Sequence, residues 1–191
     1  MGVTLTDPNR ERVPSFTLGV ADVSPLEMAG AYATVAARGL HCDARPVQRI
    51  LNASGQVFKN YPKRCKQVMK QETADTVNDI LRGVQEPGGF GYDLGGTGLT
   101  IPSAAKTGTA QDNQAVWYAG YTPKLATAVM YNRGKLGNGD LEGYMTPFFG
   151  GQIPAKTFQA YMNSALEGTE CGSFPKPANI KSTKGTTYKK P

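Results

Sequence analysis

Two overlapping patterns between residues 101 and 111 could carry the chemistry of a serine acyl transfer. Ser103 and Lys106 have the spacing Ser-x-x-Lys, in which a lysine amine takes the proton of a nucleophilic serine. Lys106, Thr107 and Gly108 form a Lys-Thr-Gly pattern, which is typical of a substrate-binding strand. The two patterns share Lys106 but need different secondary structures, so the elements predicted around them decide between them.

The Ser-x-x-Lys pair needs a helix, because residues i and i+3 lie on the same face of a helix. Ser103 instead follows Pro102 and leads into a predicted strand, where residues three apart point to opposite sides of a sheet. The second match, from Ser173 to Lys176, contains Pro175. We predict that neither serine is a nucleophile.

The Lys-Thr-Gly pattern fits a strand that borders a cleft. The lysine supplies positive charge, the glycine lets a substrate backbone approach, and neighbouring hydroxyls bind a carboxylate. Lys106, Thr107, Gly108 and Thr109 occur in this order just before a segment rich in β-branched and aromatic residues. The residues alone leave one alternative open, a surface strand with a solvated lysine.

Three segments predict helices. Residues 25–38 follow Ser24, and Glu27 completes a Ser-x-x-Glu capping box with that serine. Residues 71–82 and 153–167 also have apolar residues at helical spacing, and all three segments end at a glycine. We expect the core-facing residues to be Leu26, Ala29, Ala33 and Ala36 in the first helix, Val77, Ile80 and Leu81 in the second, and Phe158, Met162, Ala165 and Leu166 in the third.

The remaining segments predict strands and one long loop. A Ser-Gly turn within residues 47–58 indicates a hairpin. Residues 104–110, 115–123 and 125–132 are rich in β-branched and aromatic side chains and predict an antiparallel meander. Residues 85–102 are expected to be a structural loop, since their glycines do not match a phosphate-binding pattern. This order of elements predicts an α+β fold, with helices packed on an antiparallel sheet.

Length and charge suggest one folded domain and a tail. The chain has 191 residues and a net charge of +6, of which lysines after Cys171 contribute +5. We expect residues 1–171 to fold and the Lys-, Pro- and Thr-rich residues 172–191 to be disordered. No basic and aromatic stripe favours nucleic-acid binding. No apolar run approaches the ~20 residues that cross a bilayer.

The cysteines and the single histidine, His41, do not predict a metal site. We therefore expect neither a metal nor a cofactor. Cys42 and Cys65 flank the predicted hairpin, which could bring them together in a disulfide. The alternative is that both, like Cys171, are small buried thiols.

Three blocks of sequence resemble, in order and spacing, the second half of the transpeptidase domain of penicillin-binding proteins, most closely the bifunctional class A enzymes. The blocks read SFTLGVADVSPLEMAGAYATVAARG, AAKTGTAQDNQAVWYAGYTPKLATAVMY and FFGGQIPAKTFQAYMNSALEG. The resemblance covers about residues 13–168. It implies an antiparallel sheet with helices packed on both faces, incomplete in this chain, with the Lys-Thr-Gly strand at the edge of the active-site cleft.

The resemblance implies a serine acyl transfer that cross-links peptidoglycan stem peptides ending in D-Ala-D-Ala, and β-lactams would acylate the same serine. By this resemblance Lys106 would be catalytic, supplying positive charge and a proton relay. Thr107 and Thr109 would bind the terminal carboxylate, and the Thr109 N–H would be an oxyanion-hole donor. Gly108 would keep the cleft open.

The sequence departs from the family pattern in lacking a helical Ser-x-x-Lys and the Ser-x-Asn loop motif. Both normally lie upstream of the equivalent of Val13. We therefore expect this chain to be an inactive fragment of a larger protein. That larger protein would be held at the outer face of the bacterial plasma membrane by an N-terminal anchor, which we expect to be missing from this chain. A non-catalytic penicillin-binding-like module, and a D,D-carboxypeptidase or serine β-lactamase, are the alternative readings.

Overall fold

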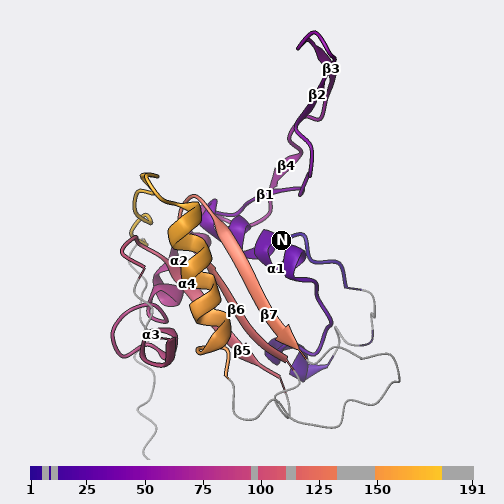
Figure 1. Cartoon of the computed structure of the whole chain (residues 1–191). Coiled ribbons are helices and arrows are strands. Elements are labelled where there is room, and N and C mark those ends of the chain that lie inside the picture. The colour runs from indigo at the N-terminus through magenta and orange to yellow at the C-terminus, as the bar shows by residue number, and fades with distance from the viewer. Residues whose placement is uncertain (6–8, 10–12, 96–98, 111–114, 133–148, 178–191) are drawn as a thin grey trace, which may run out of the picture.

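A three-stranded antiparallel sheet lies at the centre of the molecule (Figure 1). Its strands are β5 (Ala104–Thr109), β6 (Ala115–Tyr121) and β7 (Ala126–Asn132), in that spatial order. The meander predicted from the sequence is thus confirmed. The computed structural model describes residues 1–5, 9, 13–95, 99–110, 115–132 and 149–177.

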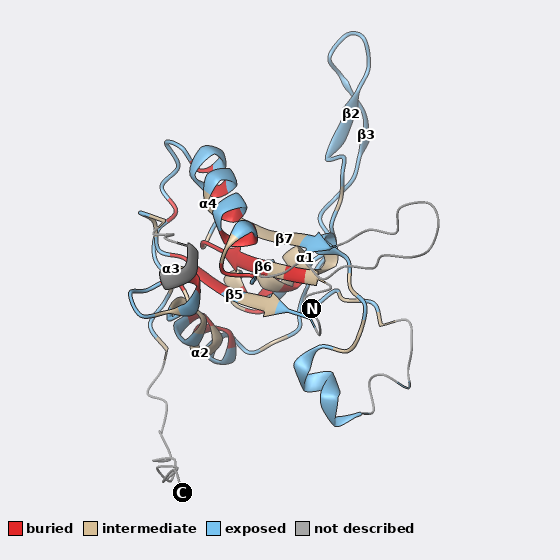
Figure 2. Cartoon of the chain, turned by 60° about the horizontal axis from the view of Figure 1, so that its bottom comes forward, coloured by how far each residue is buried: buried red, intermediate tan, exposed pale blue. Residues whose placement is uncertain are grey.

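Helix α4 (Ile153–Ala165) covers one face of the sheet. Ala105 of β5 and Tyr118 of β6 point to this face and form a buried cluster with Phe158 and Met162. The rings of Tyr118 and Phe158 pack with their centroids 5.0 Å apart. Burial is densest where the sheet meets this helix (Figure 2). Of the core-facing residues predicted for this helix, Phe158, Met162 and Leu166 are buried, whereas Ala165 is exposed.

Helix α1 (Pro25–Ala36) packs on the opposite face, where Val35 contacts Ala104 and Tyr121 in a second buried cluster. The helix begins with the predicted capping box. Glu27 N–H donates to Ser24 Oγ at 3.2 Å, and Ser24 N–H donates to Glu27 Oε2 at 3.1 Å. Hydrogen bonds from Ser24, together with one from the Thr4 backbone, lower the pKa of the Glu27 carboxyl.

The apolar stripe predicted for this first helix is only partly correct, since Ala36 packs against this second cluster and Ala29 is half-buried. Leu26 is 67% exposed and Ala33 is exposed, while Ala31, Thr34 and Val35 are buried. Small apolar residues occur on every side of α1, so their spacing does not indicate which side the sheet covers. Thr34 can be buried because its hydroxyl donates to the Gly30 carbonyl at 2.8 Å and lies 3.0 Å from His41 Nδ1.

In helix α2 (Gln71–Arg82), Val77 and Leu81 pack against the core as predicted, but the helix also buries polar side chains. Ile80, expected in the core, is 65% exposed, whereas Asn78 and Asp75 are buried. The Tyr121 hydroxyl donates to Asn78 Oδ1 at 2.8 Å, and Asp75 accepts two hydrogen bonds from Arg38 at 2.9 and 2.7 Å. These partners offset the cost of burying an amide and a carboxylate.

A hairpin arm projects from this body (Figures 1 and 2). Its outer part pairs β2 (Arg49–Leu51) with β3 (Val57–Asn60), which confirms the predicted hairpin. Its base pairs β1 (Leu40–Cys42) with β4 (Cys65–Gln67). The partners Cys42 and Cys65 form a disulfide, and Cys171 is a free, buried thiol.

Short elements complete the described chain. A 3-10 helix, η2 (Pro14–Leu18), precedes α1. Helix α3 (Phe90–Gly95) lies inside the segment that we expected to be a loop. Phe174 packs edge-to-face on Tyr121 with ring centroids 5.6 Å apart. Most of the predicted tail, residues 178–191, lies outside the described residues. The predicted α+β class, with an antiparallel sheet and helices on both faces, is confirmed.

Candidate functional site

The candidate site is the open edge of β5. In an antiparallel pair, backbone groups alternate between the partner strand and the opposite edge. The Ala110 N–H donates to the Ala115 carbonyl at 2.8 Å, which places Gly108, two residues earlier, among the residues bonded to β6. Thr107 and Thr109 therefore direct their backbone N–H and C=O groups away from β6. Within the described part of the chain, no strand pairs with this edge.

The ammonium group of Lys106 lies at this edge. The side chain is exposed, and Nζ donates to the Thr107 carbonyl at 2.8 Å. Because that carbonyl points away from β6, the contact holds the charge beside the open backbone groups. An ammonium carries three N–H donors, so it can bind an anion at the edge while keeping this contact.

The threonine hydroxyls lie on the face that α4 covers. Thr107 and Thr109 are two residues apart and so point to the same side of β5, with Thr107 half-buried and Thr109 exposed. Thr109 Oγ1 accepts a long hydrogen bond, 3.4 Å, from the Gly150 N–H. The edge thus combines one cation, a backbone N–H and hydroxyl groups, which is a set of donors suited to a carboxylate and a developing oxyanion.

Sequence reasoning missed the role of Gly150, which lies just before α4. A Cβ atom at this position would lie 2.2 Å from the Trp117 carbonyl oxygen and 2.7 Å from the Gly108 carbonyl oxygen. No side chain fits there, so the glycine allows the segment before α4 to pack directly against the backbone of the Lys-Thr-Gly strand. The sequence feature that could have indicated this close contact is the Gly-Gly pair of FFGGQIP, which precedes a predicted helix.

The two serines with Ser-x-x-Lys spacing are placed as predicted. Ser103 precedes β5 directly and is 7% exposed. It lies two residues before Ala105, so its side chain is expected on the face of the sheet that α4 covers. It is three residues from Lys106 and lies on no helix. Ser173 is exposed and lies outside any helix or strand. Neither serine can place its hydroxyl on a helix face beside a lysine.

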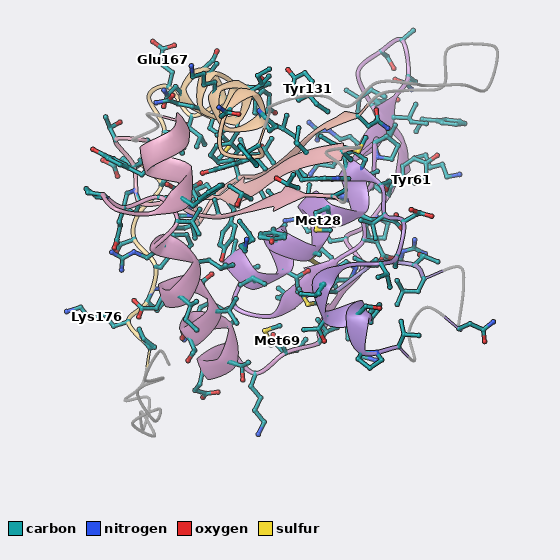
Figure 3. The ribbon with its side chains drawn as sticks, turned by 90° about the horizontal axis from the view of Figure 1, so that it is seen from below. Met28, Tyr61, Met69, Tyr131, Glu167 and Lys176 are labelled. Carbon is teal, nitrogen blue, oxygen red and sulfur yellow. A yellow bond between two sulfur atoms is a disulfide. The ribbon has the colours of Figure 1, made fainter. Side chains whose placement is uncertain are left out.

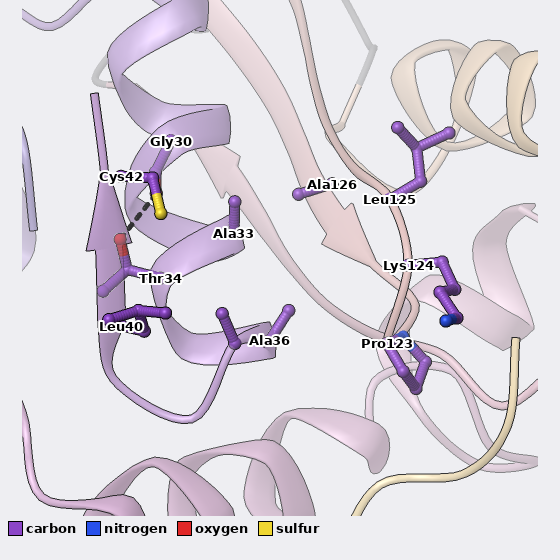
Figure 4. Close-up of a pocket in the computed structure, with 11 residues that line it drawn as sticks. Gly30, Ala33, Thr34, Ala36, Leu40, Cys42, Pro123, Lys124, Leu125 and Ala126 are labelled. Carbon is purple, nitrogen blue, oxygen red and sulfur yellow. Dashed lines mark hydrogen bonds between the residues drawn. The ribbon is translucent and has the colours of Figure 1, made fainter. Parts of the chain in front are cut away.

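A hollow of about 240 Å³ lies elsewhere, between α1, β1 and the turn that joins β6 to β7 (Figure 4). Small side chains such as Ala33, Ala36 and Ala126 line much of it. None of the residues from Lys106 to Thr109 lines this hollow. The open edge of β5, rather than the hollow, therefore carries the donors that sequence analysis singled out.

Solved structures with this fold define the class of protein. The chain is similar to the penicillin-binding protein PonA1 from Mycobacterium tuberculosis, with a TM-score of 0.73 and 30% identity, over 92% of this chain and 47% of that one. A second PonA1 structure, in complex with penicillin V, gives a TM-score of 0.74 and 29% identity, over 92% of this chain and 48% of that one.

The sequence comparisons agree. Penicillin-binding protein 1A from Mycolicibacterium smegmatis is 34% identical over 186 residues, which are 93% of this chain and 23% of that protein. The model of the penicillin binding protein transpeptidase domain matches residues 6–163. The chain belongs to this transpeptidase family, and the resemblance to class A penicillin-binding proteins is confirmed. It spans less than a quarter of the length of that relative.

Proposed function

We propose that this chain forms the carboxylate-binding and oxyanion wall of a peptidoglycan D,D-transpeptidase. The observation that carries the proposal is the open edge of β5, where Lys106 Nζ lies 2.8 Å from the outward carbonyl of Thr107 and the Thr109 backbone is directed outward as well. Positive charge, hydroxyl groups and an N–H donor are thus arranged along one strand edge. The whole protein would act at the outer face of the bacterial plasma membrane, and residues 1–171 would be the folded part of this chain.

The edge would serve both halves of a serine acyl transfer. A serine outside this chain attacks the carbonyl between the two D-Ala residues, the C–N bond breaks, and D-Ala leaves with a proton. An amine of a neighbouring stem peptide then takes the acyl group and frees the serine. The Thr109 N–H would stabilise the oxyanion, a contribution of about 3 kcal/mol. Lys106, Thr107 and Thr109 would bind the terminal carboxylate of the stem peptide or of a β-lactam.

A hybrid enzyme tests this assignment. Residues 13–171 would replace the matching segment of the Mycolicibacterium smegmatis relative, and D-Ala release from a stem pentapeptide would be measured. Thr109→Val removes the hydroxyl but keeps the backbone N–H, so we expect KM to rise roughly 10-fold with a smaller change in kcat, as for loss of one charge-assisted hydrogen bond. Thr73→Val, on the exposed side of α2, is the matched control. An unchanged KM in the Thr109 variant would show that its hydroxyl does not bind the substrate.

A further inference from the structure

Beyond its base at β1 and Asp43, the hairpin arm, residues 44–68, is basic and exposed. From residue 44 to residue 71 the sequence has seven basic residues and no acidic residue. Every residue from 46 to 68 is exposed. Large apolar side chains share this surface, above all Phe58, which is 76% exposed. A surface of this composition is complementary to an anionic partner that also offers apolar contacts.

Covalent and hydrogen-bonded contacts restrain the base and the tip of the arm. The Cys42–Cys65 disulfide closes its base, where Arg64 Nε also pairs with Asp43 at 3.0 Å. At the tip, Asn52 Oδ1 accepts hydrogen bonds from the backbone N–H groups of Ser54 and Gln56, at 3.1 and 2.8 Å. A preorganised surface loses little conformational entropy on binding.

Two features disfavour insertion of the arm into a lipid bilayer. Its tip, from Asn52 to Gln56, is polar, whereas the apolar side chains lie on the flanks. In the described structure β2 and β3 pair with each other and with no third strand, so both outer edges keep unpaired N–H and C=O groups. Open sheet edges do not enter the hydrocarbon region, because nothing there satisfies them. Hydroxyl-rich polymers can satisfy them.

We propose that the arm is a second peptidoglycan-binding site, separate from the β5 edge. Carboxylates of the stem peptides would pair with Arg49, Lys59 and Lys63, the C–H faces of the sugars would contact Phe58 and Tyr61, and sugar hydroxyls would bond the open strand edges. The proposal rests on the proposed function, which brings the chain to this polymer. Two contacts on one polymer raise the effective concentration of stem peptides at the β5 edge.

Co-sedimentation with insoluble, protein-free peptidoglycan stripped of phosphate polymers tests the proposal on the full chain. The triple variant Arg49→Glu, Lys59→Glu, Lys63→Glu should bind at least 10-fold more weakly than the unaltered chain. Its matched control is Lys124→Glu, Lys156→Glu, Lys176→Glu, which makes the same charge change at exposed positions and should bind within 2-fold of the unaltered chain. Figure 3 shows Lys176 on the opposite side of the molecule from Tyr61 of the arm. Circular dichroism checks that all three proteins fold alike.

Further measurements separate the carboxylates from other anions. Amidation of the peptidoglycan carboxylates should abolish the difference between the two triple variants, and Phe58→Ala should weaken binding without lowering the melting temperature. Equal binding by both triple variants would overturn the proposal. The proposal would also be overturned, in favour of a lipid surface, by the following result. The unaltered chain binds vesicles of phosphatidylglycerol and phosphatidylcholine but not peptidoglycan, and the arm variant does not bind the vesicles. D-Ala release by the hybrid, which reports on the β5 edge, distinguishes failure of this proposal from failure of the proposed function.

Discussion

Tyr121 shows how single residues hold the two layers of the molecule together. It lies on β6, donates its hydroxyl to Asn78 of α2 at 2.8 Å, and packs against the rings of Tyr32 and Phe174. Burial raises the pKa of the Tyr121 phenol, and burial raises that of Tyr32 as well. The sheet therefore depends on a phenol that stays neutral.

This dependence predicts how stability varies with pH. A tyrosine in the unfolded chain ionises near pH ~10, whereas the folded state holds Tyr121 neutral to higher pH. The contribution to the free energy of unfolding is therefore complete below pH ~10 and is lost as the pH rises above it. We expect urea midpoints to fall between pH 9 and pH 11, and Tyr121→Phe to reduce that fall. Tyr61→Phe, on the exposed arm, is the control, and an equal fall in both variants would refute the prediction.

At the scale of elements, the arm depends on its disulfide more than on packing. Its residues are exposed almost throughout, so they add little hydrophobic stabilisation. The bond between Cys42 and Cys65 closes a loop with a sequence separation of 23, which restricts the unfolded chain. Such a closure stabilises a protein by roughly 3 kcal/mol.

We therefore expect the double variant Cys42→Ser, Cys65→Ser to lose about 3 kcal/mol in the free energy of unfolding, measured with urea. Reduction of the unaltered protein should have the same effect. Cys171→Ser is the comparison for a buried thiol that takes no part in the bond. A double variant as stable as the unaltered protein would show that the covalent closure contributes nothing.

Local signals predicted most elements but not the faces that they bury. The capping box at Ser24 and the Ser-Gly turn of the hairpin are short-range signals, and both elements formed where expected. The burial of Asn78 and Asp75 depends on Tyr121 and Arg38, which are distant in sequence, so periodicity favoured Ile80 instead. Likewise, Lys-Thr-Gly indicated the candidate strand, whereas the contact of Gly150 requires the folded start of α4.

The whole molecule separates a net acidic body from basic extensions, because residues 44–71 carry +7 and the lysines after Cys171 carry +5 of a total net charge of +6. The body carries the β5 edge between α4 on one face and α1 on the other, while the arm projects from it (Figure 1). Among the described residues, no helix has both the length and the hydropathy of a membrane-spanning segment. The fold and the family assign the transpeptidase architecture. Within it, we propose that the β5 edge recognises the substrate and that the nucleophile comes from another part of the protein.

The most direct test is the second-order rate constant for acylation of the hybrid enzyme by a fluorescent penicillin. We expect the hybrid to be labelled, Ser103→Ala to be labelled at the same rate, and Lys106→Ala to be labelled at least ~100-fold more slowly, because it loses both charge and proton relay. Lys124→Ala is the matched control for removal of an exposed lysine. A folded Lys106→Ala hybrid labelled at the unaltered rate, or loss of labelling with Ser103→Ala, would contradict the account.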